Sequence, residues 1–523
     1  MKKHILSAFG LIAAFTMSAT QYMHINLPDG KEYDVKVEKT DRVSHVTEGK
    51  EVFIKVNRTD GSSSLYPMNG AEVTFDEEIA RMDGDVANWN ILKMAEGCVY
   101  DTTKVHELRE SGADQNEIEK ELQKAQKEFD QCVSEKKSEN ETTFNQDEIE
   151  ALRSAYRYST TLLINISKEE NHKDKNIVFS PTSLQFALAM LANGADDDDA
   201  YAEITNALGK QNIPLDELNE MYAKRINNLT TLNPRKVKMG VANAAFLKIG
   251  TTFGKNFLQN IEEYYKAVVN NVDFGQDSTY TLMDNWAKAS TDSMIQEIGV
   301  QKEVGLAFVL ANALCFKSEW KEPFSVKSTV PGKFVTSNGE EKQLEKMNQL
   351  FLHGYAEGAN YQLVTLDLYE GFVMNIILPN ENSSFESVLA EIDLDSIQYK
   401  YDPDTIYCPS LSLPKFNTDD NIPLNHVLIK MGFKNTFKKY FNYIAESTYV
   451  SGMNQLTHLE IDEEGAKGAA ITTIVGKEIS APTPKFNKNI EVDVNRPFIV
   501  TVNNPKTHEV LFIGLINDPT LKN

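Results

Sequence analysis

The segment that most restricts the fold of this chain runs from residue 147 to residue 523, where helical patterns come first and strand patterns follow. Apolar residues recur at helical spacing in its first part, over 147–167, 182–193, 200–208, 254–268 and 279–298. Apolar runs typical of strands dominate its second part, at 306–316, 361–368, 372–378, 406–413, 457–462, 490–502 and 509–515. Helices and strands that are segregated along a chain are typical of an α+β fold, so we expect one mixed domain with a large sheet over 147–523.

Residues 1–20 have the pattern of a secretory signal peptide. Two lysines precede an apolar run over 5–17, and small residues follow at 18–20. A bilayer span needs about 20 apolar residues, and neither this run nor any later one is long enough. We therefore expect a secreted or extracytoplasmic protein, located at the cell surface, in the periplasm or in the extracellular space.

Residues 21–80 predict a small β-rich module. Alternating segments flank Asp29-Gly30 and again Asp60-Gly61, and Asp-Gly between such segments is a strong signal for a β-hairpin. Two hairpins bury little apolar surface, so the module is either a surface-docking unit or a spacer.

Residues 86–140 predict a polar helical segment. Glu, Lys and Gln dominate 117–137, with a few apolar residues at helical spacing. An exported chain can form disulfides, and Cys98 and Cys132 bracket this segment, so we expect a bond between them. A helical hairpin, a solvated spacer and a coiled-coil surface for a partner are the three interpretations of this segment.

Composition and missing motifs exclude several classes of protein. The 76 acidic residues outnumber the 53 basic ones, giving a formal net charge of −23, whereas binding to nucleic acid needs a basic surface. The motifs GxSxG, HExxH, the P-loop and a strand–helix GxGxxG are absent, and the nine histidines are scattered. The four cysteines also lack the spacing of a zinc site. From the missing motifs and this spacing together, we expect no enzyme activity, no metal and no cofactor. The run Asp196–Asp199 is interpreted as a solvated turn, with cation binding as the alternative.

A series of short strings within 147–523 resembles the serpin family in order and spacing. The strings include NIVFSPTS (176–183), VANAAF (241–246), LANALCFKSEW (310–320), LPKF (413–416), DEEG (462–465), RPF (496–498) and LFIG (511–514). The resemblance implies a serpin fold with three β-sheets, about nine helices and an exposed reactive-centre loop. The β-hairpin module and the helical segment would precede that fold, as extra parts of a secreted, bacterial-type member.

The resemblance also implies a function. Inhibitory serpins offer the reactive-centre loop to a protease as bait, form an acyl-enzyme, and insert the cleaved loop into the main sheet. The chain would then be a suicide-substrate inhibitor of a serine or cysteine endopeptidase, and not an enzyme. A non-inhibitory serpin that acts as a binding or structural protein is the alternative.

The loop begins at a hinge whose residues are Glu463, Glu464, Gly465, Ala466, Lys467, Gly468, Ala469 and Ala470. Gly465 is expected to supply backbone freedom for the pivot. Alternate residues of an inserted strand face opposite sides of the sheet, and the set Ala466, Gly468, Ala470, Thr472, Ile474 and Gly476 contains no charge. Lys467 and Lys477 both fall in the other set. Because a buried unpaired charge would oppose insertion, this segregation favours an inserting loop over a plain linker.

The usual loop length of the family places the bait bond at Ile479–Ser480, which implies a protease of elastase-like preference. Lys477 and Glu478 are alternative bait residues, for trypsin-like and Glu-specific enzymes. The expected partner is therefore a target protease, and the expected state is a monomer, without nucleic acid and without a membrane span.

The resemblance further implies a polar cluster where the sheet opens, made up of Ser180, Ser183, Asn312, Gln455 and Trp320. Three positions depart from the family pattern. Gln455 stands where His is usual, Ala466 stands where Thr or Ser is usual, and Ile471 is bulkier than the usual Ala. These departures suggest that the opening step is tuned differently.

Overall fold

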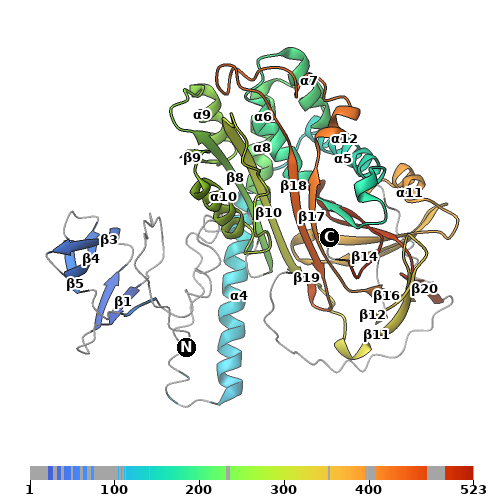
Figure 1. Ribbon diagram of the computed structural model, residues 1–523. Coiled ribbons are helices and arrows are strands. Elements are labelled where there is room, and N and C mark those ends of the chain that lie inside the picture. The colour runs from blue at the N-terminus through green and yellow to red at the C-terminus, as the bar shows by residue number, and fades with distance from the viewer. Residues whose placement is uncertain are drawn as a thin grey trace. The chain divides into compact units, whose positions relative to one another are not determined.

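The computed structural model describes residues 142–230, 232, 236–350, 354–394, 397, 408–467 and 489–521, together with parts of the region before them. Those parts are the strands between Tyr22 and Phe75, positions 104, 108 and 111, and residues 114–140. The chain divides into two compact units, Met1–Lys136 and Lys137–Asn523 (Figure 1).

The strands of the first unit form two three-stranded antiparallel sheets. The first sheet has the order β2-β1-β6, with β1 (Tyr22–Asn26), β2 (Glu32–Lys36) and β6 (Glu72–Phe75). The second has the order β3-β4-β5, with β3 (Thr40–Glu48), β4 (Glu51–Arg58) and β5 (Ser63–Pro67). The two Asp-Gly turns lie outside the described residues, and the module predicted for 21–80 stays a prediction.

Helix α4 (Gln115–Asn140) occupies the polar segment. Its Ile118, Ala125 and Phe129 are buried and lie at helical spacing. Cys132 on this helix is disulfide-bonded. Cys98 lies outside the described residues, so the pairing of these two cysteines stays a prediction. No helix among the described residues is both long and apolar enough to cross a membrane.

Helices of the second unit begin where capping residues favour them. At the start of α5 (Gln146–Ser167), the side chain of Asn145 accepts the backbone N–H of Glu148 at 2.9 Å, and the Glu148 carboxylate accepts the N–H of Asn145 at 2.7 Å. Helix α6 (Pro181–Ala192) has Ser180 as its N-cap and Pro at its first position. The other α-helices described are α7 (Asp198–Ala207), α8 (Leu215–Thr230), α9 (Lys255–Glu263), α10 (Asp277–Ser290), α11 (Phe385–Glu391) and α12 (Asn425–Lys430).

The main sheet has six strands in the order β17-β18-β19-β10-β8-β9. They are β17 (Phe416–Pro423), β18 (Asn454–Ile461), β19 (Gly465–Lys467), β10 (Phe308–Glu319), β8 (Val237–Lys248) and β9 (Val268–Val272). Strands β10 and β18 are both antiparallel to β19, so they run parallel to each other.

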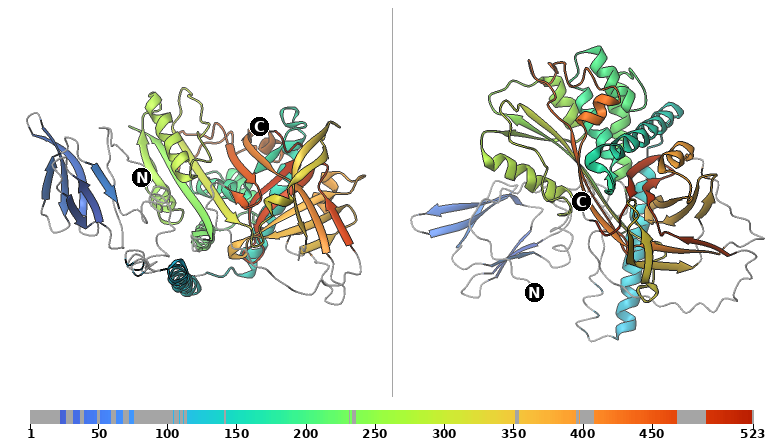
Figure 2. Two further views of the ribbon diagram at one scale, coloured as in Figure 1. Left: turned by 90° about the horizontal axis from the view of Figure 1, so that it is seen from below. Right: turned by 45° about the vertical axis from the view of Figure 1, so that its right-hand side comes forward.

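Two further sheets complete the second unit (Figure 2). One has the order β13-β14-β15-β21-β22-β7, with β13 (Gly354–Glu357), β14 (Tyr361–Asp367), β15 (Val373–Pro379), β21 (Phe498–Asn504), β22 (Glu509–Ile516) and β7 (Ile177–Phe179). The other has the order β11-β12-β16-β20, with β11 (Val330–Val335), β12 (Glu341–Leu350), β16 (Cys408–Pro414) and β20 (Asn489–Asp493).

The main sheet has an apolar cluster on each face. On one face, Leu314 and Phe316 of β10 and Leu459 of β18 belong to the large core of the unit. On the other face, helix α10 covers the sheet (Figure 1), and its Met283 packs in a smaller cluster with Ala311 of β10. Side chains along each strand of this sheet therefore alternate, so that one faces the core and the next faces α10.

Several boundaries differ from those expected from the sequence. The helical patterns at 254–268 and 279–298 extend past the helices, which end at Glu263 and Ser290. Beyond Ser290 the backbone turns at Asp292 and Ser293, where φ is positive. The apolar run 490–502 contains two separate strands, β20 and β21. Helix α8 and strand β8 are not among the elements that the apolar patterns predict.

Candidate functional site

Strand β19 lies between β10 and β18 at one end of the main sheet. Ala466 pairs with Ser318 on β10 and with Ile461 on β18, and its side chain is buried in the core. The turn that precedes β19 is closed by Asp462, whose carboxylate accepts the backbone N–H of Glu464 at 2.9 Å. The segment from 462 to 467 is thus a short hairpin already built into the sheet.

Gly465 in this hairpin makes a close contact that its sequence position did not indicate. Its φ is not in the left-handed region, so no special backbone freedom is used there. A Cβ atom at this position would collide with the backbone of β10 at Ser318. The glycine therefore permits close approach of two strands in this conformation, and the backbone freedom it would supply when the hinge pivots stays a prediction.

Trp320 holds the hairpin from the side of β10. Its indole N–H donates to the backbone oxygen of Asp462 at 2.9 Å, and its own backbone N–H donates to that of Glu464 at 2.9 Å. Phe324 adds a third bond, from its N–H to the oxygen of Glu463 at 2.9 Å. Because Trp320 is almost fully buried, these bonds are shielded from water.

The carboxylate of Glu463 is held by two donors from other elements. Thr329 donates its hydroxyl at 2.7 Å, and Lys415 donates its ammonium group at 3.2 Å. Burial disfavours the charged form of Glu463, but these hydrogen bonds outweigh it, so the pKa of Glu463 lies below its usual value. The hinge is anchored by a charge pair that the sequence pattern did not single out.

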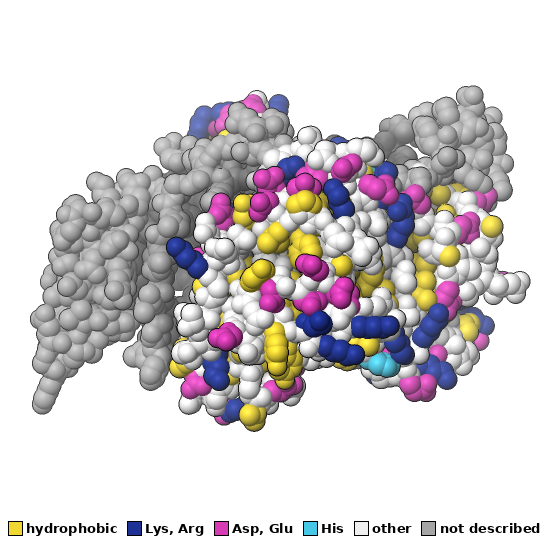
Figure 3. Space-filling model, turned by 90° about the horizontal axis from the view of Figure 1, so that it is seen from above, with side chains coloured by type: hydrophobic (Ala, Val, Ile, Leu, Met, Phe, Trp, Pro, Cys, Tyr) yellow, Lys and Arg dark blue, Asp and Glu magenta, His cyan; other side chains and the backbone are white. Residues whose placement is uncertain are grey.

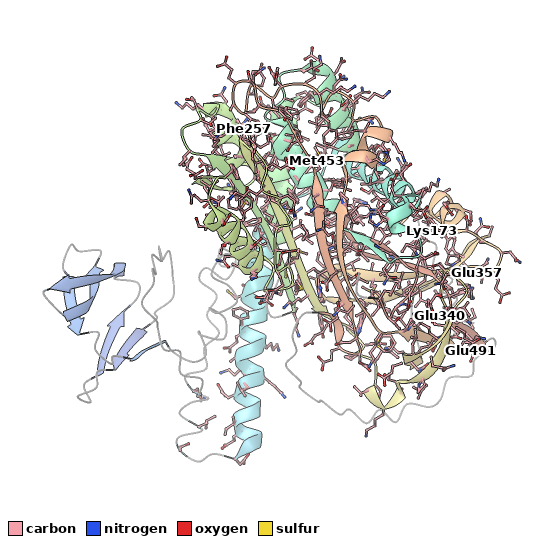
Figure 4. All side chains as sticks on the ribbon, in the orientation of Figure 1. Lys173, Phe257, Glu340, Glu357, Met453 and Glu491 are labelled. Carbon is pink, nitrogen blue, oxygen red and sulfur yellow. The ribbon has the colours of Figure 1, made fainter. Side chains whose placement is uncertain are left out.

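Beyond β19 the strands β10 and β18 separate toward the α6 end of the sheet (Figure 1). Among the described strands, none pairs with the facing edge of β10 over 308–317 or of β18 over 454–459. A cavity of about 970 Å³ lies there, lined by residues 308–313, 454–456 and, from α6, Leu184, Leu188 and Leu191. Met453, labelled in Figure 4, borders it just before β18 begins. Strand edges in this arrangement can accept a further strand.

Asn312 and Gln455 occupy equivalent positions on the two sides of this cavity. Asn312 lies six residues before Ser318, and Gln455 lies six residues before Ile461, the two partners of Ala466. The side chain of Asn312 donates to Asn243 of β8 at 2.8 Å, while its Oδ1 is buried without a hydrogen-bond partner.

Gln455 bridges β18 to the loop that starts α6. Its Nε2 donates to the backbone oxygen of Ser180 at 2.9 Å, and its Oε1 accepts the backbone N–H of Ser180 at 3.2 Å. The hydroxyl of Ser180 in turn accepts the N–H of Ser183 at 3.1 Å. An amide thus makes both bonds without a change of protonation.

The comparison that decides the family is with a model described as Serpin (serine protease inhibitor), which matches residues 154–519. The chain belongs to the serpin family. Members of this family are generally protease inhibitors and not enzymes. The fold expected from the resemblance, with three sheets and about nine helices, is confirmed.

Individual relatives and solved structures agree with this family. Human neuroserpin is 26% identical over 368 residues, which cover 67% of this chain and 88% of that protein. An uncharacterised serpin-like protein of Methanosarcina mazei is 25% identical over 358 residues, covering 67% and 83%. The thermophilic serpin tengpin in its native state has a TM-score of 0.63 at 27% identity, covering 72% and 96%. Human thyroxine-binding globulin, at 21% identity and a TM-score of 0.62 over 72% and 100%, shares the fold.

The serpin site brings some predicted residues together and separates others. Ser180, Ser183 and Gln455 form one hydrogen-bonded group, and Asn312 bonds to β8 across the cavity from them. Trp320, which was expected in the same cluster, lies at the hinge. Gly468, Ala469 and Ala470 of the hinge and the bait candidates Ile479, Ser480, Lys477 and Glu478 lie outside the described residues, so their roles stay predictions.

The acidic run Asp196–Asp199 has contacts that a plain solvated turn would not have. Asp197 caps α7 and pairs with Lys439 at 2.9 Å, and Asp196 accepts the backbone and side-chain N–H groups of Asn442 at 3.0 and 2.7 Å. Figure 3 shows acidic and basic side chains interspersed over the end of the serpin domain seen from above. No group of three or more potential metal-binding side chains occurs among the described residues.

Proposed function

We propose that this serpin is a suicide-substrate inhibitor that traps a serine or cysteine endopeptidase as a covalent acyl-enzyme. The protease would attack the loop after β19, and the cleaved loop would enter the cavity between β10 and β18 as a new strand. One observation carries this proposal: β19 already pairs with both of these strands at one end of the cavity.

The register of β19 supports insertion of an uncharged face. Ala466 is 1% exposed and lies on the core side, so residues at even positions after it would follow it there. That set has no charged member. Thr472, six residues after Ala466, would lie between Asn312 and Gln455, where its hydroxyl could donate to the unpartnered Oδ1 of Asn312.

Insertion would also satisfy the main-chain groups of both facing edges. Each hydrogen bond of a new ladder contributes about 0.5–1.5 kcal/mol net. A strand that pairs on two sides gains such bonds along its whole length, and burial of Ile474 on the core side would add to them. Insertion of the cleaved loop into the cavity would therefore lower the free energy of the protein.

The bait bond in this proposal is Ile479–Ser480, and the target is an elastase-like protease. Lys477 and Glu478 are the alternative bait residues, for trypsin-like and Glu-specific proteases. The proposal also includes export directed by residues 1–20 and a monomeric state. It further includes a disulfide between Cys98 and Cys132, which the bonded state of Cys132 supports.

A non-inhibitory serpin is the second candidate function. Thyroxine-binding globulin is by its name a binding protein, and at 21% identity its likeness to this chain concerns the fold alone. The uncharged core-facing set from Ala466 to Gly476 favours the inhibitor, because a binding protein has no need of a loop that can be buried.

The test is incubation of the full chain with elastase-like, trypsin-like and Glu-specific serine proteases and with a papain-like cysteine protease. We expect an adduct that survives denaturing electrophoresis, and a released C-terminal fragment that begins at Ser480. The control is the same protease with its nucleophile chemically blocked, which should give neither. Cleavage in the loop by every protease of the panel, with no adduct, would favour the non-inhibitory alternative.

A further inference from the structure

Lys346 of β12 is a lysine that the fold buries almost completely. Its side chain is 2% exposed, and its Nζ donates to Oδ1 of Asp493 on β20 at 2.6 Å. Asp493 is 52% exposed, and its second oxygen accepts the side-chain N–H of Asn495 at 3.2 Å. Lysine is rarely buried to this extent unless it is paired, so the ion pair with Asp493 accounts for the burial of Lys346.

Gly332 on the neighbouring strand β11 leaves the space that the stem of this lysine occupies. A Cβ atom at position 332 would lie 2.7 Å from Cδ of Lys346. The φ of Gly332 is not in the left-handed region, so the backbone conformation does not require glycine there. The glycine is therefore explained by the slot for the buried lysine stem.

Strand β20, which carries Asp493, is held in its sheet on one side only. It lies at the edge of the sheet β11-β12-β16-β20 and pairs in parallel with β16. Lys346 reaches it across β16, since Lys346 pairs with Pro414 and Asp493 pairs with Ser412. The ion pair therefore ties the edge strand to β12, a strand that is not its neighbour.

The two strands that flank the reactive loop in the sequence lie at the same end of the main sheet. Residues 468–488 connect β19 to β20. Strand β16, the neighbour of β20, leads through Lys415 into β17, whose Phe416 pairs with Ile461. Ile461 is also a partner of Ala466 in β19, so the sheet that contains β20 adjoins the hinge.

Insertion of an uncut loop would pull on β20. By the register of β19, position 476 would come opposite Phe308 at the far end of β10. The stretch of β10 from Phe308 to Ser318 covers about 33 Å. Residues 477–488 would have to run this distance back to β20, and at full extension they reach at most about 40 Å. Departure of β20 from its sheet would relieve so taut a return, because it adds five residues to the connection.

We propose that Lys346 is a positioning residue that keeps β20 in its sheet, so that the reactive loop inserts fully only after it has been cut. Departure of β20 would take Asp493 away and leave a buried ammonium group without its carboxylate, which is unfavourable. Cleavage between positions 479 and 480 separates the inserting segment from β20, so insertion then leaves the ion pair intact. Lys346 touches neither the bait bond nor the protease.

The inference rests on the proposed function for its consequence, but the tie itself is measurable without any protease. The test is Lys346→Met in the full chain, which keeps an apolar stem in the slot and removes the charge. We expect hydrogen–deuterium exchange of the peptide that covers residues 489–494 to become about tenfold faster, the effect of losing one hydrogen bond between charged groups. The uncut protein should also become heat-resistant on incubation about tenfold faster. Its initial melting temperature should not fall, because an apolar residue of similar volume often replaces a buried ion without loss of stability.

The matched control is Lys333→Met on β11 of the same sheet. Lys333 pairs with Glu341 at 2.6 Å, and both side chains are 55% exposed, so we expect neither rate to change. A second variant, Asp493→Asn, leaves the buried ammonium without its carboxylate, so it should show both faster exchange and a lower melting temperature. Lys346→Met/Asp493→Asn should recover the melting temperature and keep the fast exchange.

Two results would overturn the proposal. One is unchanged exchange of 489–494 in Lys346→Met, or in Asp493→Asn if Lys346→Met fails to fold. The other is an increase that Lys333→Met matches, which would mean that any lysine of this sheet has the same effect. A protein that forms no protease adduct but shows the expected exchange rates would contradict the proposed function and leave the tie between β12 and β20 established. An adduct of the unmodified protein, with unchanged exchange in Lys346→Met, would contradict this inference alone.

Discussion

Gly465 and Ser318 approach so closely that a Cβ atom on the glycine would lie 2.1 Å from the backbone oxygen of the serine. This contact joins the first residue of β19 to β10, at the point where the loop enters the sheet. A side chain there would force the two backbones apart, because neither partner is a flexible side chain that can move aside.

The first prediction concerns this contact. Gly465→Ala should weaken the pairing of β19 with β10 and destabilise the intact protein by about 1–3 kcal/mol, as overpacking usually does. The measurement is the free energy of unfolding in urea. Gly339→Ala is the control, since Gly339 has open space around it although its φ of 85° will cost some stability. Equal stability of Gly465→Ala and the unmodified protein would show that the hinge readily shifts.

The second prediction concerns the core face of the loop. Ala466→Arg would bury a guanidinium group between Ser318 and Ile461, its two cross-strand partners, neither of which carries a charge. Loop insertion should then lose the race against deacylation, so the variant should be cleaved as a substrate. Denaturing electrophoresis should show the cut chain and no adduct. A full yield of adduct would mean that position 466 is not on the core side when insertion proceeds.

The third prediction concerns heat resistance after cleavage. If the cut loop fills the cavity of about 970 Å³, the nicked protein should melt well above the intact one, because ladder hydrogen bonds form on two edges. Differential scanning calorimetry of both forms measures this. Thr472→Val should reduce the gain, since the Oδ1 of Asn312 would stay unsatisfied. Identical melting temperatures before and after nicking would contradict insertion.

The fourth prediction concerns acid. The folded-state pKa of Glu463 is lower than its usual 4.5, so its contribution is complete above that value and is lost as the pH falls through the folded pKa. Protonation would release Thr329 and Lys415 from the hinge. The difference in unfolding free energy between the unmodified protein and Glu463→Gln should therefore shrink below about pH 4.5, from a value on the order of 1 kcal/mol at pH 7.

The control for this acid dependence is Glu341→Gln on the exposed side of β12. Its partner Lys333 is 55% exposed, and such surface pairs contribute little. If Glu463→Gln and Glu341→Gln follow the same curve from pH 7 to pH 3, the carboxylate at the hinge has no special role.

The fifth prediction concerns specificity. Ile479→Arg should create inhibition of trypsin-like proteases and weaken inhibition of elastase-like ones, because a guanidinium group suits an acidic primary pocket and not a small apolar one. Mass spectrometry of the released fragment should still find a start at Ser480. A start at Glu478 in the unmodified protein, with a high yield of trypsin adduct, would identify Lys477 as the bait residue.

The sequence alone determined the fold family and the side of the sheet that Ala466 faces. Each of the short strings that resemble the family forms a turn, a cap or a strand. Such local structures depend on residues that are close in the chain, so they can be recognised from the sequence. The segregation of Lys467 and Lys477 from the uncharged set follows from the two-residue period of a strand, which is a property of the backbone. For that reason the side assigned to Ala466 agrees with its burial in the core.

Only the tertiary structure decided which residues meet. Trp320 lies at the hinge and not beside Gln455, Glu463 finds Thr329 and Lys415, and Asp292 finds Lys238 and Lys317. Each of these pairs joins elements that are remote in the chain or separated by a turn, so no periodicity or spacing contains them. Gly465 makes the same point: its sequence position suggests freedom of rotation at the hinge, which stays a prediction, whereas only folding brings a neighbouring backbone within 2.1 Å of the missing Cβ.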